Sequence, residues 1–212
     1  MKRAICYPVV FLSALIVLSS AQMLSAGTAR NRVRHRIIAE TGEAAPAGGV
    51  YGPFFINATL NARHEIAFDA IVTGPPQTIG VFVEDGKKTS TIALGTNPDP
   101  DEPSFGTATN PFITNDGDVV FDGNTGIFRS NRKKIVPLVQ IGEAIPGRGT
   151  VTSPPGQRVV NDHGTIAYKV SVSGAAATQA IFRTDGTRTT TIASDDIAPR
   201  PAASSSLYRT LT

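Results

Sequence analysis

The chain has very few of the residues that hold metals or form covalent cross-links. Of its 212 residues, one is cysteine and three are histidine. The cysteine, Cys6, lies in the N-terminal apolar segment, so the rest of the chain can form neither a disulfide nor a cysteine metal site. The histidines His35, His64 and His163 are too scattered to make a zinc site without a further ligand. We therefore expect no zinc and no disulfide framework.

The sequence also lacks the short motifs that mark common enzyme classes. It contains no Gly-x-Ser-x-Gly nucleophile elbow, no glycine-rich phosphate loop and no His-Glu-x-x-His helix. Their absence favours a protein without enzymatic activity.

Positive charge is concentrated at the N-terminus. The sequence pI is about 9.2, but six of the 20 Lys and Arg residues lie in the first 36 positions, where there is no Asp or Glu. The 14 remaining basic residues face 17 acidic ones, so the net charge after position 36 is −3. Because phosphate binding needs basic density on the folded surface, we expect no nucleic-acid partner.

A basic pair, an apolar run and a group of small residues follow one another at the N-terminus. Lys2-Arg3 precede the run from Ala4 to Leu18, and Ser19-Ser20-Ala21 follow it, which is the order of regions in a secretory signal peptide. We expect cleavage after Ala21 or Ala26 and a periplasmic, extracellular or cell-surface protein. The alternative is an uncleaved membrane anchor, because positions 4 to 24 approach the roughly 20 residues that span a bilayer.

An eight-residue motif occurs three times, starting at Asn61, at Thr114 and at Asn161. Its aromatic residues, which are Phe68, Phe121 and Tyr168, are 53 and 47 residues apart, so the chain repeats with a period of about fifty residues. The first residue, asparagine in two copies, can hydrogen-bond its own backbone. The fourth residue, Gly117 or Gly164, accepts the left-handed backbone of a turn. His64 takes the fourth place in the first copy, and histidine tolerates positive φ better than most residues.

Alternating apolar residues predict four short antiparallel strands in each copy. The motif's aromatic lies on strand two, and a second aromatic lies on strand three: Phe82, Phe128 and Phe182. Strand four follows a hairpin turn at 85–86, 131–132 or 185–186, which we expect to be type I′ with positive φ at both residues. Strand one is expected at 54–60, 111–113 and 158–160.

Four antiparallel strands per fifty residues are the make-up of a β-propeller blade. We predict an all-β protein: tandem four-stranded antiparallel repeats, in a partial or open β-propeller-like array, after an N-terminal signal or anchor helix. The predicted segments are a signal peptide or anchor at 1–26, a basic linker at 27–36, the last strand of an incomplete repeat at 37–45, repeats at 46–98, 99–145 and 146–198, and the start of a further repeat at 199–212.

Three whole blades are fewer than the roughly four to eight that close a propeller. Three explanations remain open. The chain is a fragment of a longer array, it is a truncated remnant without function, or its open sheet edges pair with another copy.

The motif resembles that of the bacterial tandem repeats called NxxGxxAF, some of which are described as choice-of-anchor proteins. The resemblance covers Arg36 to Thr212 and implies an exported, propeller-like protein of undetermined activity, with no catalytic residues to transfer. The third copy matches in full except for tyrosine in place of phenylalanine. The matching residues are Asn61, Ala67 and Phe68 in the first copy, Gly117 and Phe121 in the second, and Asn161, Gly164, Ala167 and Tyr168 in the third.

One acidic loop could bind a cation. Asn97, Asp99 and Asp101 place side-chain oxygens at alternate positions, as calcium loops do, but the loop lacks the glycine and the distal glutamate of the standard motif. We expect no cofactor, with Ca²⁺ at this loop as the one alternative.

The predicted function is an exported binding or surface-interaction module without enzymatic activity, with a polysaccharide or a surface protein as its partner. The alternative is a polysaccharide hydrolase or lyase that uses carboxylates such as Asp69, Asp122 and Glu84. Asp69 and Asp122 occupy one position of strand two, but Lys169 takes that position in the third copy, which disfavours a catalytic pair.

Overall fold

A computed structural model describes residues 35–74, 77–95, 105–174 and 176–196. These residues are all-β and include no helix, hence none that could cross a membrane. The chain divides after Arg36 into two units, and the unit from Ile37 onward carries all the described strands. The predicted signal or anchor segment lies outside the described residues.

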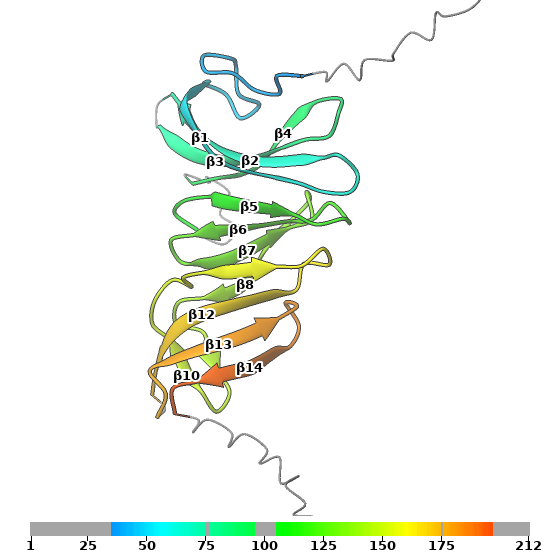
Figure 1. Ribbon diagram of the computed structural model, residues 1–212. Coiled ribbons are helices and arrows are strands. Elements are labelled where there is room, and N and C mark those ends of the chain that lie inside the picture. The colour runs from blue at the N-terminus through cyan, green and yellow to red at the C-terminus, as the bar shows by residue number, and fades with distance from the viewer. Residues whose placement is uncertain (1–34, 75–76, 96–104, 175, 197–212) are drawn as a thin grey trace, which may run out of the picture. The chain divides into compact units, whose positions relative to one another are not determined.

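Three antiparallel sheets follow one another along the chain (Figure 1). In the first two sheets the four strands pair in sequence order, as the sequence predicts. The first sheet contains β1 (Val50–Leu60), β2 (Ile66–Thr73), β3 (Thr78–Glu84) and β4 (Thr89–Leu94). The second sheet contains β5 (Thr109–Ile113), β6 (Val119–Gly123), β7 (Gly126–Ser130) and β8 (Ile135–Gln140). The prediction of tandem four-stranded antiparallel repeats is thus confirmed.

The third sheet keeps this plan with an interrupted first strand. Two short strands share that place beside β12, and a further strand extends the sheet, so its order is β14-β13-β12-β10-β9 with β11 also on β12. The strands are β9 (Ala144–Ile145), β10 (Gly149–Val151), β11 (Arg158–Val160), β12 (Ile166–Ser173), β13 (Gln179–Thr184) and β14 (Thr189–Ser194). The sequence predicts β11 but not β9 and β10.

The first and third sheets share one register at an offset of one hundred residues. Phe68 pairs with Phe82 as Tyr168 pairs with Phe182. The last strand of each sheet has a register shift at the same place, beside Val81 in the first sheet and Ile181 in the third. Residue n of the first sheet therefore corresponds to residue n+100 of the third.

Residues 37–43 form no strand, although the sequence predicts one at 37–45. A fourth strand needs a third strand beside it, and the described residues provide none at this end. The segment instead leads into a loop that recurs one hundred residues later. Gly42 N donates to Tyr51 O at 2.8 Å, as Gly142 N donates to Val151 O at 2.9 Å.

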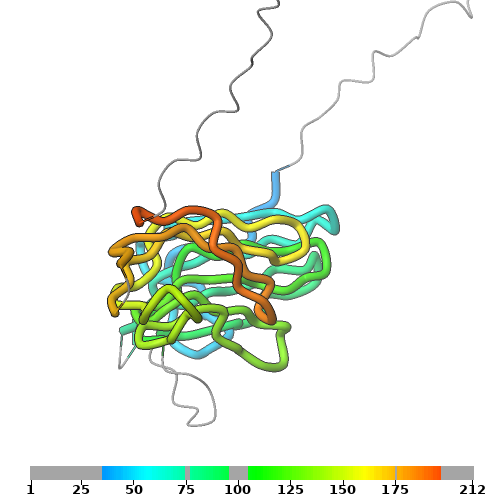
Figure 2. The backbone as a smooth tube through the Cα atoms, turned by 90° about the horizontal axis from the view of Figure 1, so that it is seen from below, coloured from blue at the N-terminus to red at the C-terminus, as the bar shows by residue number. Residues whose placement is uncertain are grey.

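The sheets pack face to face, because alternate residues of each strand point to opposite faces. The second sheet lies between the other two (Figure 1), and the sheets overlie one another in the perpendicular view (Figure 2). The side chains that point toward the next sheet along the chain are small or aliphatic, and they pack against the aromatic pair of that next sheet. The first contact joins Ala67, Val81, Val83 and Ala93 to Phe105, Phe121 and Phe128, and the second joins Val120, Ile127 and Val139 to Tyr168 and Phe182.

The turn between strands one and two has the predicted geometry in all three sheets. Asn61 Oδ1 accepts hydrogen bonds from Arg63 N and Glu65 N at 3.0 Å each, and Asn161 Oδ1 does the same for the equivalent amides. His64 has φ 63°, Gly117 91° and Gly164 76°. The predicted use of histidine at positive φ is confirmed.

The prediction of type I′ hairpins is wrong. Positive φ occurs only at the second residue of each tip, at Gly86 (88°), Arg132 (67°) and Gly186 (91°). The first residue instead accepts hydrogen bonds through its side chain. Asp85 Oδ1, for example, accepts from the backbone N of Lys87 at 2.9 Å and of Lys88 at 3.0 Å. Because the carboxylate satisfies these amides, a single left-handed residue is enough to close the turn.

Candidate functional site

Asp69, a candidate catalytic carboxylate, is fully buried and fully engaged. Its Oδ1 accepts from Asn57 N at 2.6 Å, and its Oδ2 accepts from Asn57 Nδ2 at 3.1 Å and from Asn110 N at 2.7 Å. Asn57 belongs to the same sheet and Asn110 to the next, so one carboxylate joins two sheets. A substrate cannot reach it, because none of its surface is exposed.

Asp122 takes the same position in the second sheet and makes the next link. It accepts from Asn110 Nδ2 at 2.7 Å and pairs with Arg158 Nε, and Arg158 also donates to Asn110 O. The side chain of Arg158 is only 4% exposed. Asp69, Asn110, Asp122 and Arg158 thus form one polar bridge through the three sheets, which we call the Asn110 bridge.

Asn110 and Arg158 were not among the functional residues predicted from the sequence. A signal for Asn110 exists, since Asn57 and Asn110 are 53 residues apart, as are Phe68 and Phe121. An asparagine that recurs at one place in an apolar strand indicates a hydrogen-bonding role. No comparable recurrence marks Arg158. The residue of the third sheet that corresponds to Asn57 is Gln157, and Arg158 is its neighbour.

Glu84 has a local role at the end of β3. It is 4% exposed and accepts a hydrogen bond from Gly86 N at 2.8 Å. Glu84 pairs with Ile66 and Asp69 with Val81, three positions along the strands, so the two carboxylates point to opposite faces of the sheet, about 10 Å apart along it. The structure does not make them a catalytic pair.

The buried tyrosines carry neutral hydroxyls. Burial, and secondarily the charge of Glu43, raises the pKa of Tyr51 to about 12. Burial and the charge of Glu143 also raise the pKa of Tyr168, against a hydrogen bond with Thr189. Neither side chain is suited to act as a base at neutral pH.

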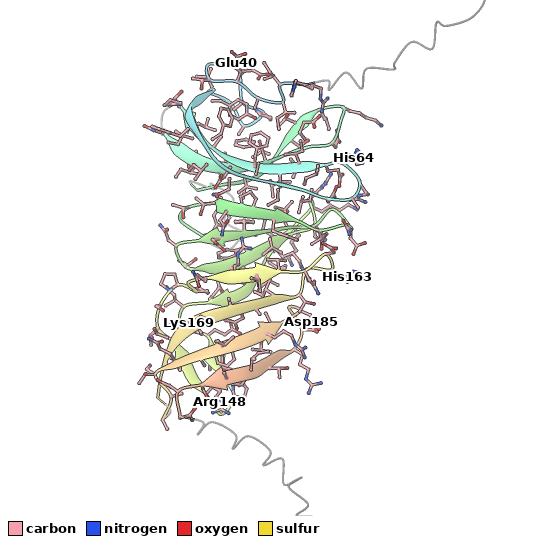
Figure 3. The ribbon with its side chains drawn as sticks, viewed as in Figure 1. Glu40, His64, Arg148, His163, Lys169 and Asp185 are labelled. Carbon is pink, nitrogen blue, oxygen red and sulfur yellow. The ribbon has the colours of Figure 1, made fainter. Side chains whose placement is uncertain are left out.

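The turns and the hairpin tips of all three sheets meet at one edge, because strands one and three end on the same side. Figure 3 shows His64, His163 and Asp185 along this edge, which we call the rim. The turns are linked from sheet to sheet. Asn61 Nδ2 donates to Thr114 O at 2.9 Å, and Asn115 N donates to Asp162 O at 3.1 Å.

Glu65 holds three side chains of the rim in place through hydrogen bonds and ion pairs. Its carboxylate accepts from Asn61 Nδ2 at 2.7 Å, from Arg63 Nη2 at 2.8 Å and from Arg132 Nη2 at 2.9 Å. Burial favours the neutral acid, but the hydrogen bonds from these three side chains outweigh it and lower the pKa of Glu65. Arg132, one of the basic residues of the second hairpin, is therefore held in place within the rim.

Exposed cations lie at the hairpin tips. Lys87 and Lys88 follow Gly86, Lys133 and Lys134 follow Arg132, and Arg188 lies near the end of the third tip. Stacked sheets are about 10 Å apart, so these charges recur at roughly that interval. Acidic residues lie among these cations, with Asp116 and Asp162 on the turns and Asp85 and Asp185 at the start of two hairpin tips.

A second distinctive surface is the face of the third sheet that points away from the second sheet, which we call the open face. Its apolar side chains include Val159 (70% exposed), Ile181 (41%) and Ile192 (56%). Lys169 and Arg183 lie among them and are exposed as well. A groove of about 730 Å³ lies along β11 at the edge of this sheet, lined by Arg158, Val159, Lys169 and Ile181 and by Asn110 of the second sheet.

The described residues contain no group of three His, Cys, Asp or Glu side chains that could hold a metal ion. His64 and His163 lie on turns of different sheets and do not come together (Figure 3). The predicted calcium candidates Asn97, Asp99 and Asp101 lie outside the described residues.

The fold and these surfaces define a tandem β-sheet repeat protein whose candidate catalytic carboxylates serve to join its sheets and turns. The chain belongs to a family described as Family of unknown function (DUF7453), which it matches over residues 9–209. A search of curated proteins found no match, and a search of solved structures also found none.

Proposed function

We propose that this chain is an exported, non-enzymatic module that binds an anionic polysaccharide through the row of cations on its rim. The observation that carries the proposal is the engagement of the candidate carboxylates. Asp69 is buried under three hydrogen bonds, and Asp122 is paired with Arg158. Both carboxylates hold the sheets together, which favours binding by surface residues over catalysis by these acids.

The rim suits an extended polymer for two reasons. Its exposed lysines and arginine recur from sheet to sheet, as the charges of an acidic polysaccharide recur along its chain. The bonds between turns and the Glu65 contacts also hold the rim in one arrangement, which lowers the entropy lost on binding. A surface protein is the alternative partner, and neutral glycans offer no charge for the rim to recognise.

One observation favours the hydrolase alternative. Asp69 and Asp122 both bind Asn110, one through its backbone and the other through its side chain, so two carboxylates lie near each other. Asp69 has no exposed surface, and both acids already have partners. A glycosidase needs one accessible nucleophile or base and one acid that stays protonated.

The test is binding and turnover measured on the same polysaccharides. We expect the protein to bind immobilised alginate and not dextran, to lose affinity as salt rises, and to release no reducing ends. Replacing Lys87, Lys88, Lys133 and Lys134 by glutamine should weaken binding about 10- to 100-fold, at up to about 1 kcal/mol per exposed ionic contact. Lys169→Gln, on the open face, is the matched control and should bind as wild type.

Two results would contradict the proposal. The first is salt-independent binding that the four lysine substitutions leave unchanged, which would favour a protein partner or another surface. The second is release of reducing ends that Asp122→Asn abolishes while Asp116→Asn, an exposed acid on a turn, does not. That outcome would establish the hydrolase.

Export has its own test. Fractionation of expressing cells, followed by sequencing of the N-terminus, should find the chain outside the cytoplasm and starting at Gln22 or Gly27. An intact Met1 in the membrane fraction would support the anchored alternative, and a cytoplasmic chain would exclude both.

A further inference from the structure

We propose that the open face of the third sheet binds a second copy of this chain, by packing head to tail on the aromatic face of that copy's first sheet. This inference is independent of what the rim binds. It rests on the two sheet-to-sheet contacts within the chain. In each contact, one sheet presents a face of small and aliphatic side chains, which we call the forward half, to the aromatic pair of the next sheet, which we call the receiving half. The open face of the third sheet is a forward half, and the first sheet carries a receiving half.

The open face matches the covered face of the first sheet at three small or aliphatic positions. In the first sheet, Ala67 and Val81 are fully buried and Ala93 is 4% exposed, because the second sheet covers them. Their equivalents at the same register are Ala167, Ile181 and Ala193. Ile181 is 41% exposed where Val81 is fully buried. The third sheet thus presents these three small or aliphatic side chains without a cover, and it carries Arg183 in the place of Val83 and Lys169 in the place of Asp69.

The receiving half is the face that carries Phe68 and Phe82, whose rings stack at 5.5 Å. The same pair in the third sheet, Tyr168 and Phe182, receives Val120, Ile127, Leu138 and Val139 of the second sheet. In the first sheet, Ile38 and Ala39 take the places of Leu138 and Val139.

The rings of Tyr51 and Phe55 pack on Phe68 at centroid distances of 6.0 and 6.1 Å, so this aromatic face is partly covered by the chain itself, and Phe68 is 3% exposed. A hollow of about 260 Å³ remains there, lined by Ile38, Ala39, Phe55, Ile56, Asn57, Ala58 and Phe68. Phe55 is 41% and Ile56 52% exposed. In a second copy the equivalents of Val120 and Ile127 are Ala167 and Ile181, which are aliphatic as well.

One hydrogen bond within the chain supports the same pairing. Arg129 of the second sheet donates through Nη1 to Asp185 O at the hairpin tip of the third sheet, at 3.3 Å. Its equivalent on the open face is Arg183, which is exposed. The tip that Arg183 would meet in a second copy begins with Asp85. Because the observed bond goes to a backbone carbonyl, the equivalent acceptor in a second copy is the carbonyl oxygen of Asp85.

Hydrogen bonds join the turn of the first sheet to that of the second and the turn of the second to that of the third, and among the described residues the series ends there. Asn61 and Thr114 are buried in these contacts, with 6% and 1% of their surface exposed, whereas the equivalent Asn161 is exposed. Head-to-tail packing would continue the series, with Asp162 of one copy next to Ala62 of the other. The described residues of one chain form three sheets, so those of two copies would form six, within the roughly four to eight at which propellers close.

Cysteine cross-linking tests this contact directly on the full-length chain in a C6S background. D162C protein mixed with A62C protein should form a disulfide-linked heterodimer on oxidation. The two positions belong to sheets separated by the second sheet, so they cannot join within one chain. N115C/D162C is the matched control. A backbone hydrogen bond already joins these residues, within the range a disulfide spans, and this variant should close within the chain.

Failure of the heterodimer to form while N115C/D162C closes would overturn the proposal. A D162C homodimer that forms equally well would also overturn it, because that link requires two third sheets to meet.

Sedimentation provides a second measurement. Ile181→Asp should raise the dissociation constant of the dimer at least tenfold, because it places a charge in the aromatic hollow. Ile141→Asp is the matched control, since Ile141 is similarly exposed (43%) and lies outside the open face. Wild-type protein that is monomeric at all concentrations, or equal association of the two variants, would contradict the proposed contact.

Discussion

Replacing Asp69 by asparagine removes the centre of the Asn110 bridge while keeping the shape of the side chain. Both carboxylate oxygens accept backbone amides, Asn57 N at 2.6 Å and Asn110 N at 2.7 Å. An asparagine has one acceptor oxygen, so in either orientation its NH₂ group faces a backbone N–H. One buried donor then loses its acceptor, and the other loses a charge-assisted bond.

The expected cost follows from these two losses. A buried donor without a partner costs about 1–3 kcal/mol, and a neutral acceptor in place of a charged one costs about 1 kcal/mol more. The sum of about 2–4 kcal/mol is a large share of a typical stability of about 5–15 kcal/mol. With a urea m value of about 1–3 kcal/mol/M, the unfolding midpoint should fall by roughly 1–2 M.

Two matched variants make this result interpretable. Asp122→Asn should also be costly, although the Asp122 side chain is 26% exposed, because it leaves the guanidinium of Arg158, which is only 4% exposed, without its carboxylate partner. Asp116→Asn removes the same charge from an exposed turn and should change stability by less than about 0.5 kcal/mol. If Asp69→Asn unfolds at the same urea concentration as Asp116→Asn, the carboxylate does not hold the sheets together and the reasoning is refuted.

Three further predictions concern the rim. His64→Gly should raise the stability by about 0.5–1 kcal/mol, because φ 63° is a glycine conformation, and a lower melting temperature would contradict this. Gly164→Ala should cost about 1–2 kcal/mol, since the new Cβ has room, 3.6 Å from Thr114 Cγ2, but φ is 76°. The lowered pKa of Glu65 means that its carboxylate stabilises the fold above the unfolded pKa, and that this contribution is lost as the pH falls through the folded pKa. Between pH 7 and pH 3, wild type should therefore lose more of its urea resistance than Glu65→Gln, and parallel losses would contradict the assignment.

The features that the sequence predicted correctly are those decided by neighbouring residues. The Asn61 turn needs an acceptor at its first position and a residue tolerant of positive φ at its fourth, and both are visible within eight positions. The same holds for the alternation that defines β2, β6 and β12. Chain-local chemistry of this kind does not depend on what packs above or below the sheet.

The predictions that failed depend on what lies beside a segment. Residues 37–43 have the composition of a fourth strand but no third strand to pair with among the described residues. The type I′ prediction considered only backbone preferences at Asp85 and Gly86, whereas the Asp85 carboxylate satisfies the amides itself. The Asn110 bridge joins residues from three sheets, and no spacing in the sequence states which of them meet.

The three sheets carry different residues at one equivalent position, and this difference affects how each sheet binds the next. Where Asp69 and Asp122 bind the first strand of the following sheet, the third sheet has Lys169. A carboxylate at this position accepts amide and guanidinium donors, whereas an ammonium group needs acceptors. Lys169 therefore cannot bind the first strand of a following sheet in the way that Asp69 and Asp122 do. In the proposed dimer, the carbonyl groups around Asn57 in the first sheet of a second copy would offer acceptors to this ammonium. Lys169→Met, which keeps the apolar stem and removes the ammonium, should weaken dimerisation less than Ile181→Asp. An equal or larger effect would show that the contact is governed by charge rather than by the aliphatic surface.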